Sequence, residues 1–151
     1  MSVYLKAVCT VFLLGFSLTL QAEDTYVLKK SAYSVDETIN RLEAVLKKKG
    51  ITVFARVDHK AGANNVGLAM QPTQLLIFGN PKMGTPLMNE NHLMGLDLPM
   101  KALAYQDDAS QVWLAYLNPA ELQQRHNIKN QKIINKMKQA LNGLTNKALG
   151  N

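Results

Sequence analysis

Two stretches of the chain repeat apolar residues at the spacing of an amphipathic helix. The first follows Ser34, which has capping-box spacing to Glu37, and it ends at Gly50, a residue suited to a left-handed helix stop. The second begins near Asn130. The apolar stripe of the first is Val35, Ile39, Leu42, Val45 and Leu46, and that of the second is Ile133, Ile134, Met137, Ala140, Leu141 and Leu144. The pattern predicts two helices with one buried face each, the second of them long.

Extended patterns fill most of the chain between these helices. Residues 51–59 alternate, with Ile51, Val53, Ala55 and Val57 on one side. Residues 75–78 are apolar at every position, which is typical of a strand covered on both faces. Further predicted strands are 25–32, an extended segment over 66–70, and 101–107 with 111–117 as a hairpin. Thr85-Pro86 and Asn118-Pro119 have the form of helix starts, and Gly95 is a suitable stop.

The order of these elements is strand, helix, several strands, helix. It favours an α+β domain, in which helices pack on one face of a largely antiparallel sheet. The sequence shows no internal repeat or linker, so we expect a single domain over residues 23–151.

The N-terminal 22 residues have the layout of a secretory signal peptide. Lys6 precedes an uncharged apolar run, Ala7–Leu20, and Ala22 offers a small residue for cleavage. The run of about 14 residues is shorter than the roughly 20 that span a bilayer, although an uncleaved anchor is the alternative. We therefore expect a periplasmic or secreted protein without stable membrane insertion after cleavage.

Composition narrows the chemistry of the exported chain. The chain's one cysteine, Cys9, would leave with the signal, which excludes disulfides, thiol catalysis and cysteine metal sites. The formal charge would fall from +6 to +5 with the loss of Lys6, and the lysines cluster on the two long helices, as on solvated helix faces. The lysine face of the last helix lacks interleaved aromatic residues, so we do not expect nucleic-acid binding.

The segment from Gly79 to Gly84 has the glycine spacing of a phosphate-binding loop. Thr85 stands where that loop needs its lysine, and Pro86 removes a backbone N–H group, so a nucleotide site is excluded. A weaker possibility is that Asn80, Lys82 and nearby N–H groups hold the carboxylate or phosphate of a small ligand. The alternative is a rigid strand-to-helix turn.

Histidines and methionines are the remaining candidates for catalysis or metal binding. His59 and His126 could act in acid–base catalysis or as metal or haem ligands, or simply cap the edge of a core. Met88 and His92 are four residues apart on a predicted helix, a pairing that suits copper(I). Methionines also fill irregular cores, and no regular Met-x-x-Met pattern is present.

Several sequence segments, spread over nearly the whole exported chain, resemble one protein family. They are VDHKAGA (57–63), LLIFGNPKMGTPLM (75–88), GLDLPMKALAYQD (95–107), VWLAYLNP (112–119) and Arg125-His126, and they are similar to domain-of-unknown-function family 302. The resemblance implies a fold like that of the TATA-binding protein, a curved antiparallel sheet packed against a long helix, often as a homodimer. It implies no catalytic residues.

We therefore expect a non-enzymatic binding or accessory domain. Its ligand, small and anionic or apolar, would lie between the sheet and the long helix, with residues 79–101 at the mouth of the groove. The expected polar lining is His59, Asn80, Lys82, Thr85, Asp97, Lys101 and His126. The alternatives are a small hydrolase or isomerase that uses His59 with Asp97, a copper or haem protein, and a purely structural dimer.

Overall fold

The computed structural model describes residues 25–151, so the expected signal peptide and Cys9 lie outside the described residues. The strands are β1 (Tyr26–Ser31), β2 (Thr52–Asp58), β3 (Thr73–Gly79), β4 (Met100–Gln106) and β5 (Val112–Leu117). The helices are α1 (Val35–Lys48), α2 (His59–Asn65), α3 (Pro81–Glu90), α4 (Pro119–His126) and α5 (Gln131–Leu149), with a 3₁₀ helix, η1 (His92–Leu96), after α3.

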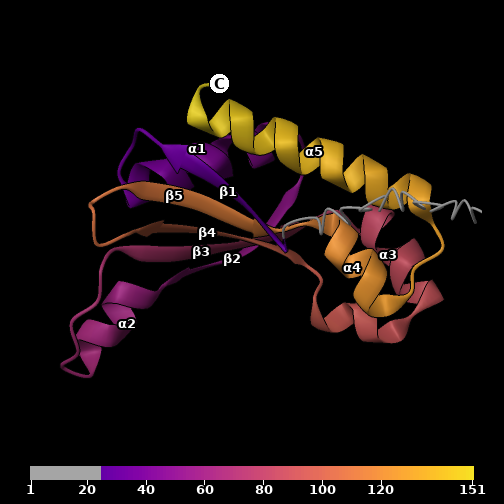
Figure 1. Ribbon diagram of the computed structural model, residues 1–151, viewed down its shortest axis with the longest axis horizontal. Helices are drawn as coiled ribbons and strands as arrows, with labels where there is room; N and C mark the ends of the chain where they lie inside the picture. Colours follow the sequence, from indigo (N-terminus) through magenta and orange to yellow (C-terminus); the bar gives the residue numbers. More distant parts are fainter. Residues whose placement is uncertain (1–24) are drawn as a thin grey trace, which may run out of the picture.

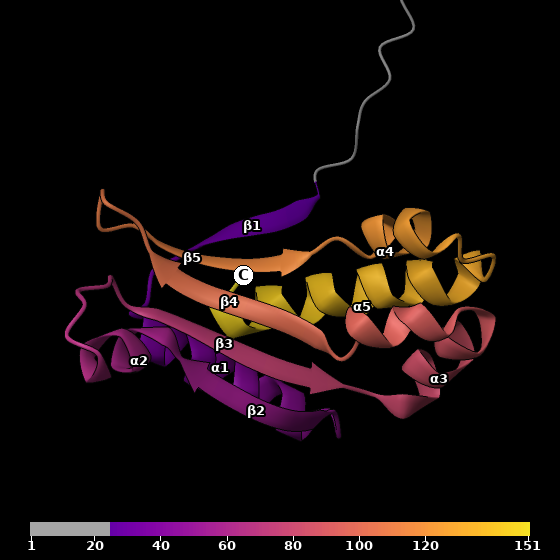
Figure 2. The ribbon, with the colours of Figure 1, turned by 90° about the horizontal axis from the view of Figure 1, so that it is seen from below.

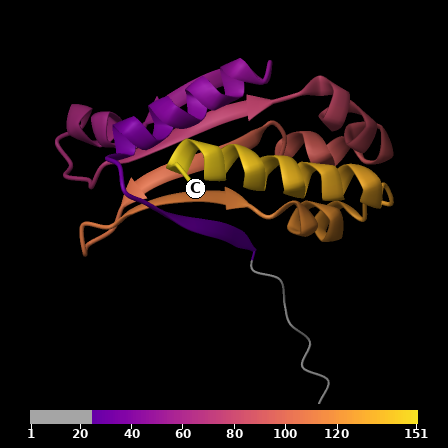
Figure 3. The same ribbon diagram turned by 90° about the horizontal axis from the view of Figure 1, so that it is seen from above.

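The five strands form one antiparallel sheet in the order β1-β5-β4-β3-β2. Helices α1 and α5 lie side by side across one face of this sheet (Figure 1, Figure 3). Helix α2 projects from one end of the sheet, and α3 and α4 lie beyond the other end. The α+β prediction, with a largely antiparallel sheet packed on a long helix, is confirmed.

Local sequence explains where the two long helices begin and end. The Ser34 side chain accepts the backbone N–H of Glu37, and the Asn130 side chain accepts that of Ile133. After α1 the chain turns through Gly50 at φ +65°, a left-handed conformation that glycine adopts without a steric penalty. These are the helix limits that the capping residues predict.

The core lies between the sheet and the paired helices. Residues from α1, α5 and the inward face of the sheet make up its centre, and all are almost fully buried: Ile39, Leu42, Leu46, Leu76, Ala102, Leu114, Ile134 and Leu141. The apolar stripes predicted for both helices supply one side of this core. Burial of these stripes, more than helix propensity, holds α1 and α5 in place.

A half-buried lysine joins the edge strand β1 to α5. The Lys29 ammonium donates to Asn142 Oδ1 at 2.7 Å and Thr145 Oγ1 at 2.8 Å, and also to Asn146 Oδ1. None of these acceptors carries a negative charge, and burial lowers the pKa of Lys29 below its ordinary value. The lysine therefore holds β1 against α5 by hydrogen bonds, while its partial burial disfavours the charged form of the amine.

We predict that Lys29→Met lowers the free energy of unfolding by about 1–2 kcal/mol at pH 7, because several hydrogen bonds to the charged amine are lost. The pKa of Lys29 is lower in the native protein than in the unfolded chain. Its contribution to the free energy of unfolding therefore increases as pH rises toward the ordinary lysine pKa of 10.5. The gap between wild type and variant should therefore widen between pH 7 and 10 in urea denaturation. Lys48→Met, at an exposed position, is the control, and an equal widening there would contradict this account.

Three of the strand predictions were wrong, at least in detail. The pairing of β2 with β3 shifts between Val53 and Ala55, so Val53 packs toward the core whereas Ala55 and Val57 lie on the opposite face. This bulge at Phe54 breaks the alternation that the sequence predicts. Strand β3 is covered by helices on one face only, where Leu76 and Phe78 are buried, while Leu75 and Ile77 are half-buried on the other. Residues 66–70 form no strand and are exposed.

Candidate functional site

The segment after β3 turns directly into a helix. Helix α3 begins at Pro81, five residues before the predicted start, because the Asn80 side chain accepts the N–H of Lys82 at 3.0 Å. Pro81 then occupies the first turn, where a missing N–H costs little, and Pro86 lies inside the helix. The glycines and prolines of this segment therefore build a capped strand-to-helix turn.

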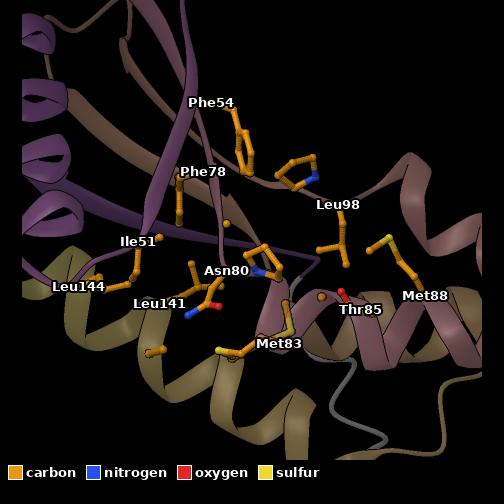
Figure 4. A pocket seen from close by; sticks show the side chains of 16 residues that line it. Ile51, Phe54, Phe78, Asn80, Met83, Thr85, Met88, Leu98, Leu141 and Leu144 are labelled. Carbon is orange, nitrogen blue, oxygen red and sulfur yellow. The ribbon is translucent and has the colours of Figure 1, made fainter.

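This turn forms one wall of a pocket of about 210 Å³ (Figure 4). The start of β2 and the end of β3 form a second wall, with Phe54 and Phe78. Helix α5 forms a third. The described residues that line it are Ile51, Phe54, Phe78, Gly79, Asn80, Pro81, Met83, Gly84, Thr85, Met88, Leu98, Pro99, Met137, Ala140, Leu141 and Leu144. Four separate segments of the chain, at 51–54, 78–88, 98–99 and 137–144, thus meet around one cavity.

The lining is almost entirely apolar. Among the lining residues that the structure describes, only Asn80 and Thr85 have polar side chains. The side-chain oxygen of Asn80 is engaged in capping α3, which leaves its amide nitrogen as a hydrogen-bond donor at the edge of the cavity. Such a site can enclose a small apolar molecule and hold one polar end of it. None of the lining side chains within residues 25–151 is charged, so these residues offer no counter-ion to an anion.

A separate polar cluster connects η1 to α4. His126 Nε2 lies 2.6 Å from Asp97 Oδ2, and Arg125 donates to Asp97 Oδ1 at 2.9 Å. Burial alone would raise the pKa of Asp97, but the His126 hydrogen bond and the positive charge of Arg125 outweigh it and bring that pKa below its ordinary value. The His126 side chain is buried, at 6% exposed. The cluster has the geometry of a structural staple between two elements.

Beside this staple, a second hollow of about 310 Å³ lies against the helix-free face of the sheet. Asp97, Lys101 and Arg125 line its polar end. The Lys101 ammonium is turned back onto the carbonyl oxygens of Asp97 and Pro99, at 2.9 and 3.2 Å. The charges in this hollow are thus already engaged with one another or with the backbone.

The structure separates the seven predicted lining residues into four places. Asn80 and Thr85 line the apolar pocket, and Asp97, Lys101 and His126 belong to the polar cluster and its hollow. Lys82 is exposed on α3 and does not line the pocket. His59 is exposed at the start of α2, beyond the end of β2 that pairs with Gln74. Asp97 thus pairs with His126 and Arg125 instead of His59.

The prediction that Met88 and His92 lie on one continuous helix was wrong. Helix α3 ends at Glu90, Asn91 is extended, and His92 begins η1 as an exposed residue. Across residues 25–151, no three His, Cys, Asp or Glu side chains gather in a way that could hold a metal ion.

Sequence reasoning missed the apolar residues that shape the pocket, chiefly Phe54, Met83 and Met137. Met137 belongs to the predicted apolar stripe of α5, and the cluster of methionines after residue 80 was visible, but neither pattern separates a cavity lining from a filled core. We recognise no sequence pattern that predicts the bulge at Phe54, a residue of the pocket lining.

The sequence has relatives that are longer than itself. It is 51% identical over 102 residues to the fluoride-specific ion channel FluC 1 of Brucella suis biovar 1 (strain 1330) and to FluC 2 of Brucella melitensis biotype 1. The match covers 68% of this chain but only 40% and 38% of those proteins, less than half of their length. Within the described residues, no helix combines the length and apolarity that a membrane span requires.

A solved structure supports the fold. The crystal structure of an uncharacterized conserved DUF302 protein from Bacillus stearothermophilus aligns with a TM-score of 0.74 at 25% identity, covering 82% of this chain and 98% of that one. The model of one family also matches residues 27–144, which take in β2 to β5, all of β1 except Tyr26, and most of α5. On both grounds this chain belongs to the family described as Domain of unknown function DUF302.

Proposed function

We propose that this protein is an exported, non-enzymatic binding domain that takes a small, mainly apolar ligand in the pocket between β2, β3, α3 and α5. The observation that carries the proposal is the pocket itself: an apolar cavity with Asn80 and Thr85 at its edge. Small-molecule sites are typically apolar hollows with a few placed polar groups, and this pocket has that composition.

The size and lining of the pocket limit the ligand. A cavity of about 150 Å³ lined by apolar side chains accepts a molecule such as benzene, so a cavity of about 210 Å³ has room for a somewhat larger one. Lys82 lies outside the lining, which favours an apolar ligand over an anionic one. Met83, Met88 and Met137 have flexible side chains that adapt to ligands of different outline.

The role of an accessory domain draws support from the relatives. Proteins named as fluoride-specific ion channels contain a region similar to this chain within a longer sequence. An ion channel operates in a membrane, and an exported domain of the same kind would act at the outer side of one. The signal-like residues 1–22 agree with that placement.

The polar cluster supports a non-enzymatic role. An acid–base enzyme needs its catalytic groups within reach of a substrate in an open pocket. Here His126 is buried, and both carboxylate oxygens of Asp97 already accept hydrogen bonds. His59, the other candidate base, is remote from this carboxylate. The copper alternative has one point in its favour, the three methionine side chains in the pocket.

Native mass spectrometry of the protein isolated from its own exported fraction tests the proposal. We expect a reproducible extra mass from an organic molecule, which disappears on denaturation. An added copper mass would favour the metal alternative. A bare protein that also fails to bind the probe indole, followed by NMR shifts of Asn80 and Gly84, would contradict the binding function. Absence of the protein from the exported fraction would contradict its location.

A further inference from the structure

The Asn80 side chain is held in one orientation at the rim of the apolar pocket. Strand β3 runs directly into α3 at the end of the sheet, and Asn80 is the one residue between them (Figure 2). Its side-chain oxygen accepts the backbone N–H of Lys82 at 3.0 Å. Because that N–H needs an acceptor, the bond fixes which end of the amide is the oxygen. The amide nitrogen is therefore the end left for the cavity, which Asn80 lines (Figure 4).

Within residues 25–151, no acceptor receives a hydrogen bond from the Asn80 nitrogen. Asn91 offers a comparison, because its side-chain oxygen caps η1 in the same way. The Asn91 nitrogen, however, donates to the carbonyl oxygen of His126 at 3.1 Å. Asn80 is exposed at the pocket and presents two N–H donors there. A molecule that enters the pocket thus meets these donors at its rim.

The first turn of α3 is closed to anions. Pro81 has no N–H group, and the N–H groups of the next three residues all donate to Asn80. Those of Met83 and Gly84 donate to its carbonyl oxygen at 2.9 and 3.1 Å, and that of Lys82 donates to its side chain. An anion at a helix start needs such groups free. Since the described lining side chains carry no charge either, the pocket favours an uncharged ligand over a carboxylate or phosphate.

Hydrogen-bond acceptors are scarce among the described lining side chains. Besides the engaged oxygen of Asn80, they offer the Thr85 hydroxyl, which both donates and accepts, and methionine sulfurs, which accept weakly. A ligand N–H group at this rim would face the N–H groups of Asn80 and would have only the Thr85 hydroxyl as a good acceptor. A ligand carbonyl oxygen would find the partner that it loses on leaving water. The site therefore discriminates between ligands by the polarity of one group as well as by shape.

We infer that the ligand of this pocket is an uncharged molecule with a hydrogen-bond acceptor at its polar end, and that the Asn80 amide selects it. Small aromatic or alicyclic ketones, aldehydes and esters form the chemical class. The apolar part of such a molecule lies against the phenylalanine, leucine and methionine side chains of the walls, and its oxygen lies beside Asn80. This inference rests on the proposed binding function and adds the class of ligand to it.

Titrations of the protein, expressed from its full sequence, with simple probes test the inference. Acetophenone carries an acceptor, indole carries a donor, and ethylbenzene carries neither. NMR shifts of Gly84 report binding, and each affinity is divided by that for ethylbenzene, so that general changes in the pocket cancel. Asn80→Ser and Asn80→Asp both keep an oxygen that can cap α3, and neither keeps the amide nitrogen.

The two variants should shift the probe preference in different ways. In Asn80→Ser we expect the acetophenone-to-ethylbenzene ratio to fall about fivefold, which is the effect of losing one hydrogen bond of ordinary net strength. In Asn80→Asp this ratio should fall further, because the carboxylate repels the carbonyl oxygen. The indole-to-ethylbenzene ratio should rise about threefold or more there, because the carboxylate accepts the indole N–H. A purely structural role of Asn80 would not produce this reversal.

Asn130→Ser is the matched control, because Asn130 caps α5 through its side-chain oxygen and does not line the pocket. It should leave both ratios unchanged. The inference is supported if the acetophenone ratio falls in both Asn80 variants and the indole ratio rises only in Asn80→Asp, with circular dichroism spectra unchanged. Ethylbenzene binding with the same ratios in wild type and Asn80→Ser would overturn the inference and leave the proposed pocket standing. Failure of all the probes to bind the wild-type protein would overturn both.

Discussion

Phenylalanine in place of Ala140 is expected to remove ligand binding from the apolar pocket. Ala140 lies on α5 and lines the cavity, so a phenyl ring at this position would take up much of a volume of about 210 Å³. The substitution adds apolar surface without introducing a charge or a polar group. We expect the affinity for indole to fall at least tenfold, a loss of about 1.4 kcal/mol in binding free energy. Titration followed by NMR shifts of the pocket residues measures it.

The neighbouring residue provides the matched control. Gln139 is exposed on the same helix and does not line the pocket, so Gln139→Phe adds the same side chain outside the cavity. It should leave indole binding unchanged. The cost of overfilling the site in Ala140→Phe should stay within about 1–3 kcal/mol of unfolding free energy, which thermal denaturation checks. Unaltered indole binding by Ala140→Phe would show that the probe binds elsewhere and would remove the pocket as the ligand site.

Much of the fold could be predicted because its long elements carry strong periodic signals. The stripes that begin at Val35 and Ile133 both mark helix faces that are buried in the structure, and the caps at Ser34 and Asn130 are where the sequence places them. The hairpin of β4 and β5 follows from two extended runs around a polar turn. In each case a local pattern is enough, since the element needs only one buried face.

The predicted elements are wrong at places where contacts between distant segments, and not the local sequence, set the conformation. Nothing in the sequence near Phe54 specifies the bulge, because a bulge depends on the register with β3. Thr85-Pro86 has the composition of a helix start, yet Asn80-Pro81 offers an equally good cap five residues earlier and the structure uses it. Leu75–Phe78 suggests a strand with cover on both faces, whereas in the single chain only one face is covered.

The candidate site was predictable in position more than in composition. The pocket lining takes nine residues from the 79–101 segment that the sequence analysis places beside a groove, Asn80 and Thr85 among them. Asp97, Lys101 and His126 lie together outside the pocket because η1, β4 and α4 carry them there, whereas Lys82 and His59 are exposed on α3 and α2. A cavity is what packing leaves unfilled among segments such as α3, β3 and α5, and no single segment encodes it. The apolar lining could therefore not be separated from the core.

The staple between η1 and α4 gives the second large expected effect. Replacing His126 with alanine removes its bond to Asp97 and leaves a gap at a buried position, so we expect a loss of about 2–3 kcal/mol of unfolding free energy at pH 7. Because α4 leads directly into α5, the loss should appear as faster hydrogen exchange in α4 and in the first turns of α5. Urea denaturation gives the size of the effect and exchange gives its location.

The Asp97 carboxylate makes this staple sensitive to acid. Its pKa is lower in the native protein than in the unfolded chain, so its stabilising contribution is complete above about pH 4 and is lost as pH falls further. Asp97→Asn should therefore be less stable than wild type at pH 7, by about 1–2 kcal/mol, and the difference should shrink by pH 3. Glu121→Gln removes the other carboxylate beside Arg125, an exposed pair expected to contribute less than about 1 kcal/mol. An Asp97→Asn deficit that persists unchanged at pH 3 would mean that shape, and not charge, accounts for the role of Asp97.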